Sequence, residues 1–387
     1  MDTYLDIIEE IPGKDGTAMV EMQTDMMTMT VDQMTLQLTK AYSAMVKNNI
    51  PFRRFPSVML WGPPGVGKSQ GVRQIAKGIE ERTGKTVKIT DVRLLLFNPV
   101  DLRGIPTANA DKTLAIWLKP KIFQMDDSPD VVNILFLDEI SAAPQSVQAA
   151  AYQITLDRTV GEHSLPENCI VMAAGNRVTD RSVAYNMPKA LANRLCHMEI
   201  IGDHSSWHRW AVQAGIHSIV LGFLDQNPSM LMDFDAQSES LAFPTPRSWE
   251  MVSNILTDVS DNVAHVFPMI AGCIGPAAAY DLRNWSEIYA QVPEIEDIFA
   301  GKASEVPLRP ELLFALSAKM ASYAKKHHSL IQIHNAVDYA CKLPVEFRNR
   351  VFFNFLQIKA ARKALEKHRV FNDWFLRSGF SWDEYGL

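Results

Sequence analysis

Apolar and polar positions follow two different patterns along the chain, and the change falls near residue 202. Up to that point, short apolar runs alternate with stretches in which apolar residues recur at helical spacing. The runs cover residues 57–61, 87–90, 132–137, 169–174 and 197–201. Strands that alternate with helices typically form a parallel sheet covered by helices. The pattern therefore predicts an α/β fold, with an αβα core and a parallel five-stranded sheet, over residues 50–202.

The segments on either side of this core predict helices. Residues 1–49 consist of an arm and then a helix, in which Thr30 and Gln33 have the spacing of a capping box. Residues 203–292 lack comparable apolar runs and predict an all-helical lid domain. Residues 293–387 begin with a linker rich in proline and continue as a helical C-terminal extension.

Composition and charge are those of an ordinary globular protein. Of 387 residues, 47% are hydrophobic and 21% charged, and the formal net charge is −6. A mildly acidic balance is not typical of a dedicated nucleic-acid binder. Residues 301–370, however, hold 13 Lys and Arg against 5 Asp and Glu. This basic segment could bind an acidic partner or nucleic acid, and a solvated helix face is the plainer interpretation.

Targeting signals and paired cysteines are not evident. Residues 1–11 lack the basic and apolar regions of a secretory signal. The most apolar stretch, residues 266–280, is too short for a membrane span and is interrupted by proline. The four cysteines stand far apart, which predicts reduced thiols rather than a zinc or redox pair. We expect a cytoplasmic protein without membrane insertion.

One segment matches the phosphate-binding loop pattern G-x-x-x-x-G-K-[ST] at every fixed position, between an apolar run and a predicted helix over residues 70–81. The residues expected to bind the nucleotide are Gly62, Pro63, Pro64, Gly65, Val66, Gly67, Lys68 and Ser69. Glycines let backbone N–H groups approach phosphate oxygens, and the helix N-terminus adds positive partial charge. We expect Lys68 at the β- and γ-phosphates and Ser69 on Mg²⁺.

A pair of acidic residues supplies the second half of this candidate site. The apolar run 132–137 ends directly in Asp138 and Glu139. A buried strand delivers the residues at its carboxyl end to the sheet edge where ligands bind. Asp138 is expected to hold Mg²⁺ through its water shell, and Glu139 to orient the attacking water. Because side chains alternate along a strand, we attribute the two roles to opposite directions of the carboxylates. The motifs together predict an ATP hydrolase with ATP and Mg²⁺ as cofactors.

Two further features are less specific. The run 169–174 leads to Asn176, whose amide could contact the γ-phosphate or position the water, with a turn asparagine as the alternative. Residues 50–52 are the candidate for the adenine pocket, which the sequence does not otherwise define.

These motifs, in this order, resemble the AAA+ ATPases, and further segments narrow the resemblance to the MoxR family, of the helix-2-insert clade. The matching segments are DEISAAPQSVQ at 138–148, NPVDLRG at 98–104, DRTVG at 157–161 and MPKALANRL at 187–195. By resemblance, the second leads into the helix-2 insert and the third opens the pre-sensor hairpin. The similarity covers about residues 50–290 and implies a homo-oligomer, a hexameric ring.

The resemblance also implies roles for single residues. Asn176 stands where the superfamily carries its sensor-1 residue. Arg194 would be the arginine finger, which stabilises the γ-phosphoryl transition state on a neighbouring subunit. Arg247 would be the sensor-2 arginine at the start of a lid helix, and would report loss of the γ-phosphate to the lid.

The chain departs from the family pattern near these residues. Ser141 and Ala142 follow Asp-Glu-Ile, where the family has Asn-Arg, and Arg177 follows Asn176 in place of proline. Arg177 and Arg181 are therefore additional candidates for the contact between subunits.

MoxR-type proteins act on protein clients, often with a partner that bears a von Willebrand A domain. The resemblance therefore implies remodelling or activation of a client, with movement of residues 101–115 and 158–167 against it. The chain has no D-x-S-x-S motif of its own, so such a domain would belong to another protein. The alternatives are a nucleic-acid motor, such as a branch-migration or McrB-like translocase, and a nucleotide-dependent switch, against which Glu139 argues.

Overall fold

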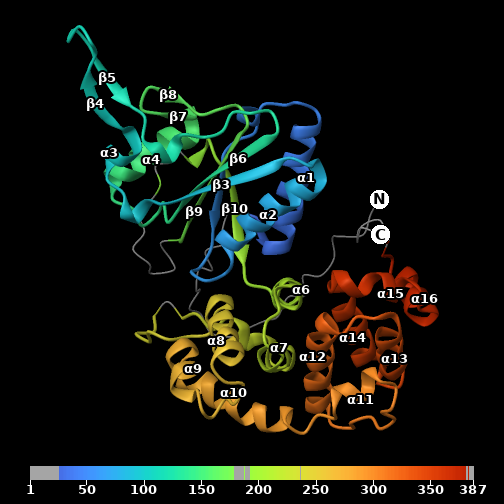
Figure 1. The fold of residues 1–387 in the computed structure, drawn as a ribbon. Helices are drawn as coiled ribbons and strands as arrows, with labels where there is room; N and C mark the ends of the chain where they lie inside the picture. Colours follow the sequence, from blue (N-terminus) through green and yellow to red (C-terminus); the bar gives the residue numbers. More distant parts are fainter. Residues whose placement is uncertain (1–25, 178–186, 188–191, 236, 381, 383–387) are drawn as a thin grey trace, which may run out of the picture.

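The computed structural model describes residues 26–177, 187, 192–235, 237–380 and 382. An α/β body holds the described residues up to about 201, and the rest form helices (Figure 1). The two parts lie beside each other, and α6 leads from one into the other. No described helix is long and apolar enough to cross a membrane. The four cysteines are free thiols.

The α/β body is built on a six-stranded sheet in the order β1-β10-β2-β9-β6-β3, and each of its pairings is parallel. Its strands are β1 (Thr28–Thr30), β2 (Val58–Trp61), β3 (Thr86–Arg93), β6 (Val131–Asp138), β9 (Cys169–Gly175) and β10 (Cys196–Ile201). The predicted α/β fold and the five predicted strands are confirmed. The sheet has six strands rather than five, because β1 extends the edge of β10. A three-residue strand is too short to show a period in the sequence.

Helices cover both faces of the sheet because its central strands are apolar on both sides. In β6, Ile134 belongs to the core beneath α1 (Val31–Lys47) and α2 (Lys68–Thr83). The next residue, Leu135, belongs to the core beneath α4 (Gln145–Asp157) on the opposite face. This three-layer packing fixes the carboxyl ends of β2, β6 and β9 at one edge of the sheet.

Two small antiparallel hairpins project from the body beside α4 (Figure 1). Helix α3 (Pro99–Arg103) precedes the first hairpin, which consists of β4 (Ile105–Ala108) and β5 (Ala115–Leu118). The second hairpin consists of β7 (Thr159–Val160) and β8 (His163–Ser164). The hairpins are in contact, since a ring nitrogen of His163 lies 2.7 Å from the carbonyl oxygen of Trp117. They occupy the segments that the family resemblance assigns to the helix-2 insert and the pre-sensor hairpin.

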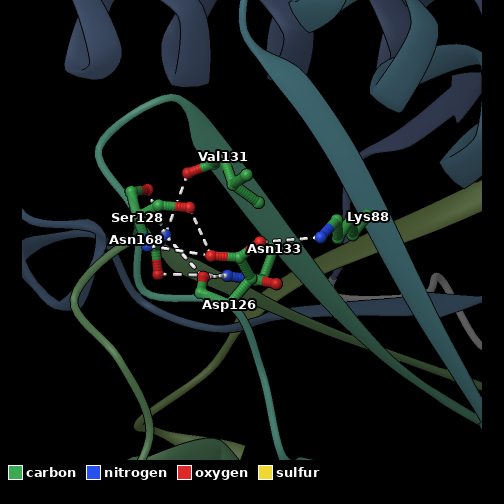
Figure 2. A network of polar contacts seen from close by, with 6 residues as sticks. All are labelled: Lys88, Asp126, Ser128, Val131, Asn133 and Asn168. Atoms are coloured by element: carbon green, nitrogen blue, oxygen red, sulfur yellow. Dashed lines mark hydrogen bonds and ion pairs between the residues drawn. The ribbon is translucent and has the colours of Figure 1, made fainter.

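A polar network fixes the loop before β6 at the amino end of the sheet (Figure 2). Asn168 Nδ2 donates to the carbonyl oxygens of Asp126, Ser128 and Val131 at 2.9, 3.3 and 2.9 Å. Asn133 Nδ2 donates to the Asp126 carbonyl oxygen at 2.6 Å and to Asn168 Oδ1 at 3.1 Å. Asn133 is buried in the middle of an apolar strand, so these bonds offset the cost of removing its amide from water.

A single apolar core joins the helices that follow the α/β body and runs from Trp207 to Phe375. The helices are α6 (His204–Ala214), α7 (Ser218–Gln226), α8 (Pro246–Asp258), α9 (Phe267–Ile274), α10 (Pro276–Tyr289), α11 (Ile295–Phe299), α12 (Pro310–Lys326), α13 (Leu330–Ala340), α14 (Val345–Gln357), α15 (Arg362–Glu366) and α16 (Arg369–Arg377). Short 3-10 helices are η1 (Phe52–Arg54), η2 (Leu94–Leu96), η3 (Lys121–Phe123), η5 (Pro228–Leu231) and η6 (Lys359–Ala361). The core continues across residue 292, and α11 lies inside the predicted linker. The domain limits at 49, 202 and 292 stay predictions.

Candidate nucleotide-binding site

The loop between β2 and α2 has the backbone that a phosphate cradle requires. Gly65 has φ +78°, and a Cβ on it would lie 3.0 Å from Thr245 in the lid segment. Helix α2 begins at Lys68 after Gly67, which provides no side-chain cap. The first N–H groups of α2 therefore lack a capping side chain, and a helix N-terminus of this kind favours an anion.

Lys68 is buried at the centre of the loop. Its Nζ donates to the carbonyl oxygens of Gly62 and Pro63 at 2.6 and 3.1 Å. It also donates to Asn176 Oδ1 at 2.9 Å, across from the end of β9. The two residues, 108 positions apart in sequence, thus meet at the carboxyl edge of the sheet.

The acidic pair lies directly beside this lysine. Ser69 Oγ donates to Asp138 Oδ2 at 2.9 Å, so the two expected metal ligands are in contact. Glu139 is exposed and lies just after β6 with φ +59°. Its side chain therefore leaves the sheet through a left-handed turn. The explanation by alternation along a strand is wrong, because only Asp138 belongs to the strand.

Ser141 positions the candidate sensor and was noted in the sequence only as a departure from the family pattern. Its Oγ accepts the backbone N–H of Asn176 at 2.9 Å. A Cβ on Gly175 would lie 2.8 Å from the same oxygen, so position 175 requires glycine. Ser141 is thus a buried link between the turn after β6 and the end of β9.

The arginines expected at the site lie in three different places. Arg247, at the start of α8, lines the same cavity as the loop. Arg177 forms an ion pair with the buried carboxylate of Glu199 in β10. Arg194 is exposed and lines a second hollow, together with Arg53 and Arg158. Arg181 lies outside the described residues.

Most of the predicted site residues line one cavity of about 210 Å³. Its lining from the predicted site comprises Pro64, Gly65, Val66, Gly67, Lys68, Ser69, Asp138, Glu139, Asn176 and Arg247. Sequence reasoning missed other parts of the lining, which include Val31 and Asp32 of α1 and Trp207 and Trp210 of α6. Residues 50–52, the candidate adenine pocket, do not line it. Phe52 is instead buried against the ring of Tyr42, with ring centroids 5.9 Å apart.

A third acidic residue lies near the pair. The pKa of Asp91 in β3 is raised, first by burial and then by the charge of Asp138, while Arg73 and Arg93 act in the opposite direction. Arg73 lines the cavity and lies 3.9 Å from Asp91. Asp91 thus adds negative potential behind Asp138, which favours a cation at this edge.

The comparisons with known proteins agree with this geometry in one respect. Residues 57–197 match a family described as "ATPase family associated with various cellular activities (AAA)". The comparison with curated proteins found no match. The matched segment includes the phosphate-binding loop, the acidic pair and Asn176, and it covers just over a third of the chain.

Similar solved structures include an ATPase candidate from Cytophaga hutchinsonii, at 15% identity and TM-score 0.29, covering 90% of this chain and 93% of that one. Others are RuvB from Thermotoga maritima, at 14% identity, TM-score 0.33, covering 75% and 84%, and PCH-2 from C. elegans, at 12% identity, TM-score 0.30, covering 77% and 68%. Such low values carry no statement about function. Residues 57–197 are thus similar to ATPase domains of the AAA type.

Proposed function

We propose that this protein is a MoxR-type AAA+ ATPase that hydrolyses ATP in a ring oligomer to remodel or activate a protein client. The observation that carries hydrolysis is the meeting of five side chains from three strand ends. Ser69 touches Asp138, Lys68 touches Asn176, and Glu139 lines the same cavity. No single motif would require this convergence.

Mg²⁺ fits the oxygen donors at this edge. The Ser69 hydroxyl and the Asp138 carboxylate are hard ligands of the kind that Mg²⁺ prefers, and Asp91 stands behind them. Bound there with ATP, the ion would neutralise charge on the phosphate oxygens. Glu139 would accept a proton from the attacking water, and Lys68 would turn from Asn176 toward the β- and γ-phosphates.

The lid side of the cavity suggests how the base is bound and how the lid follows the phosphate. Trp207 and Trp210 add aromatic surface to the cavity lining, which suits an adenine ring. Arg247 would approach the γ-phosphate from α8. Thr245, two residues earlier, packs against Gly65 of the loop, so a change in the loop would be felt at the start of α8.

Glu139→Gln tests the enzyme claim. We expect ATP binding to be kept and turnover to fall about 100-fold or more, because the amide cannot take up the proton. ATPase rate and binding of a fluorescent ATP analogue are measured at concentrations that allow assembly. Glu239→Gln, an exposed position outside the cavity, is the control. A nucleotide-dependent switch would instead show the same background rate in the wild type and in Glu139→Gln.

Arg194 is the favoured finger because Arg177 is already paired with Glu199 inside its own subunit. Arg194 is exposed and lies outside its own subunit's cavity, so we propose that it acts on a neighbour. Arg194→Ala should lower turnover about 10³-fold or more while ATP binding persists. Arg53→Ala, beside it in the second hollow, should keep turnover.

A mixing experiment separates action between subunits from loss of folding. Arg194→Ala subunits keep an intact pocket, and Lys68→Ala subunits keep Arg194. Mixed rings should regain part of the turnover that each variant lacks alone. Absence of any recovery, with mixed rings shown to form, would contradict action on a neighbour.

The exposed apolar side chains of the β4–β5 hairpin favour a protein client over nucleic acid. Ile105 and Leu118 are 59% and 55% exposed and lie opposite each other at the base of the hairpin. Apolar patches of this kind mark protein contacts. A partner with a von Willebrand A domain is proposed from the family resemblance alone. The alternative, a nucleic-acid motor that uses the basic residues 301–370, predicts DNA affinity that falls steeply with salt.

A further inference from the structure

A buried cluster of two histidines and an aspartate lies outside the nucleotide site, between α6 and α7. His204 and His208 are four residues apart on α6, so their side chains point in the same direction. Asp225 faces them from α7. One ligand atom from each residue lies within 4.8 Å of the other two. None of these three residues lines the nucleotide cavity.

The facing atoms of the cluster are poorly satisfied. The Asp225 carboxylate is fully buried, and the His208 side chain is 7% exposed. His208 Nδ1 lies 2.6 Å from Asp225 Oδ1, and His204 Nε2 lies 3.4 Å from the same oxygen. These contacts are close, but by angle none of the facing atoms has a well-directed hydrogen bond. Buried polar groups without hydrogen bonds are costly and call for an explanation.

The surrounding residues orient the three donors. His208 Nε2 lies 2.6 Å from Asn354 Oδ1, which orients the ring so that Nδ1 faces Asp225. Arg350 Nη1 pairs with Asp225 Oδ2 at 3.1 Å, so Oδ1 is the oxygen that faces both rings. Metal-binding histidines and carboxylates are typically held by such outer hydrogen bonds. Asn354 and Arg350 both come from α14, in the C-terminal extension.

We infer that His204, His208 and Asp225 bind a zinc ion. Two imidazole nitrogens and one carboxylate oxygen are a donor set that Zn²⁺ accepts, at about 2.0–2.2 Å from each atom. Donors at such distances in a tetrahedron are separated by about 3.3 Å, close to the 3.4 Å between His204 Nε2 and Asp225 Oδ1. His208 Nδ1 and Asp225 Oδ1, 2.6 Å apart, would have to separate by about 0.7 Å to bind the ion together. The fourth position is left for water. The ion would join α6, which follows the α/β body, to α7 and, through Arg350 and Asn354, to α14.

The competing occupant of this space is a proton. A His208 imidazolium paired with Asp225 would also fill the gap between the two side chains, and His204 Nε2 would then have only its 3.4 Å contact with Asp225 Oδ1 among the described residues. The two occupants differ in stoichiometric metal content, which an experiment can count. The inference does not depend on the proposed ATPase activity.

The test uses full-length protein that is stripped with a chelator and then dialysed against Zn²⁺. We expect one tightly held zinc per chain by mass spectrometry of the metal, and the intense visible absorption of tetrahedral Co²⁺ after substitution. His204→Gln and Asp225→Asn should weaken zinc binding about tenfold or more. His327→Gln with His328→Gln, an adjacent pair near the surface, and Asp138→Asn, at the nucleotide site, should retain the zinc.

Thermal unfolding tests the same site if Asp225→Asn does not fold. Zinc should raise the Tm of the wild type, and this increase should disappear in His204→Gln, whose side chain is partly exposed. A wild type that holds no zinc after this treatment would overturn the inference in favour of the ion pair. Retention of zinc by His204→Gln would likewise overturn it.

Discussion

At the scale of the residue, the Ser141 hydroxyl shows that a residue which departs from a family pattern can have a structural role. Ser141 replaces the asparagine of the resembled family, and its Oγ holds the backbone of Asn176. The sequence displays the substitution but not its partner, which is 35 positions away. The same holds for Trp207 and Trp210, whose place in the cavity depends on how α6 leaves the sheet.

Gly65 offers a test of the contact between loop and lid. Gly65 and Gly84 have φ +78° and +71°, so alanine at either position costs about 1–2 kcal/mol in backbone conformation. A Cβ at Gly65 meets Thr245, whereas one at Gly84 meets nothing within 4 Å. We expect Gly65→Ala to weaken ATP binding about tenfold or more, and Gly84→Ala to lower only the free energy of unfolding. Fluorescence titration and denaturant unfolding measure the two effects. Equal ATP affinities would contradict the contact.

At the scale of the element, the sequence predicts what is long and apolar. The runs that became β6 and β9 are buried along their length, and the capping box of Thr30 and Gln33 does start α1. Elements that were missed are short. β1 has three residues and depends on β10 for its hydrogen bonds, and α11 has five residues inside a segment rich in proline. Tertiary contacts, rather than local pattern, create elements of that size.

The site was predicted to a similar extent and for a similar reason. Local motifs placed the phosphate-binding loop and the acidic pair at strand ends, and the structure brings both to one edge with Asn176. The tryptophans and Ser141 were missed, because their positions depend on packing between segments far apart in sequence. The functional roles of these residues stay predictions until variants are measured.

Asn168 tests whether the network at the amino end of the sheet stabilises the fold. Its amide nitrogen donates to three backbone carbonyls that alanine would leave without that partner. With about 1 kcal/mol net for each bond, Asn168→Ala should lower the free energy of unfolding by roughly 2–3 kcal/mol. Denaturant unfolding measures this change. Lys88→Ala, which removes an exposed ion pair with Asp126, should change it by less than about 1 kcal/mol. A smaller effect at Asn168 than at Lys88 would refute the role of the network.

At the scale of the whole molecule, the apolar core of the helical half continues across residue 292. Helix α12, from the C-terminal extension, packs against α7, and both contribute to the core that runs from Trp207 to Phe375. Periodicity finds each helix but not which helices are neighbours, since those contacts join residues about 100 positions apart. The described lid and extension therefore share one interior.

A pair of helical glycines tests this shared interior. A Cβ at Gly222 in α7 would lie 2.7 Å from Trp285 and 3.2 Å from Ala318 of α12. Gly222→Ala should therefore lower the free energy of unfolding by about 1–3 kcal/mol through overpacking. Gly272 in α9 has open space, so Gly272→Ala should raise it by about 0.5–1 kcal/mol through helix propensity. Thermal and denaturant unfolding measure both. A stabilising Gly222→Ala would show that the two segments are not tightly packed.

The hydrogen bond between Lys68 and Asn176 has a consequence for how the site distinguishes nucleotides. The lysine ammonium donates to the asparagine amide oxygen, so a phosphate oxygen that binds Lys68 would compete with Asn176 for it. With Lys68 at the β- and γ-phosphates, a triphosphate would place its terminal phosphate near both side chains, whereas a diphosphate would reach the lysine alone. We therefore expect the two nucleotides to leave Asn176 with different hydrogen-bond partners.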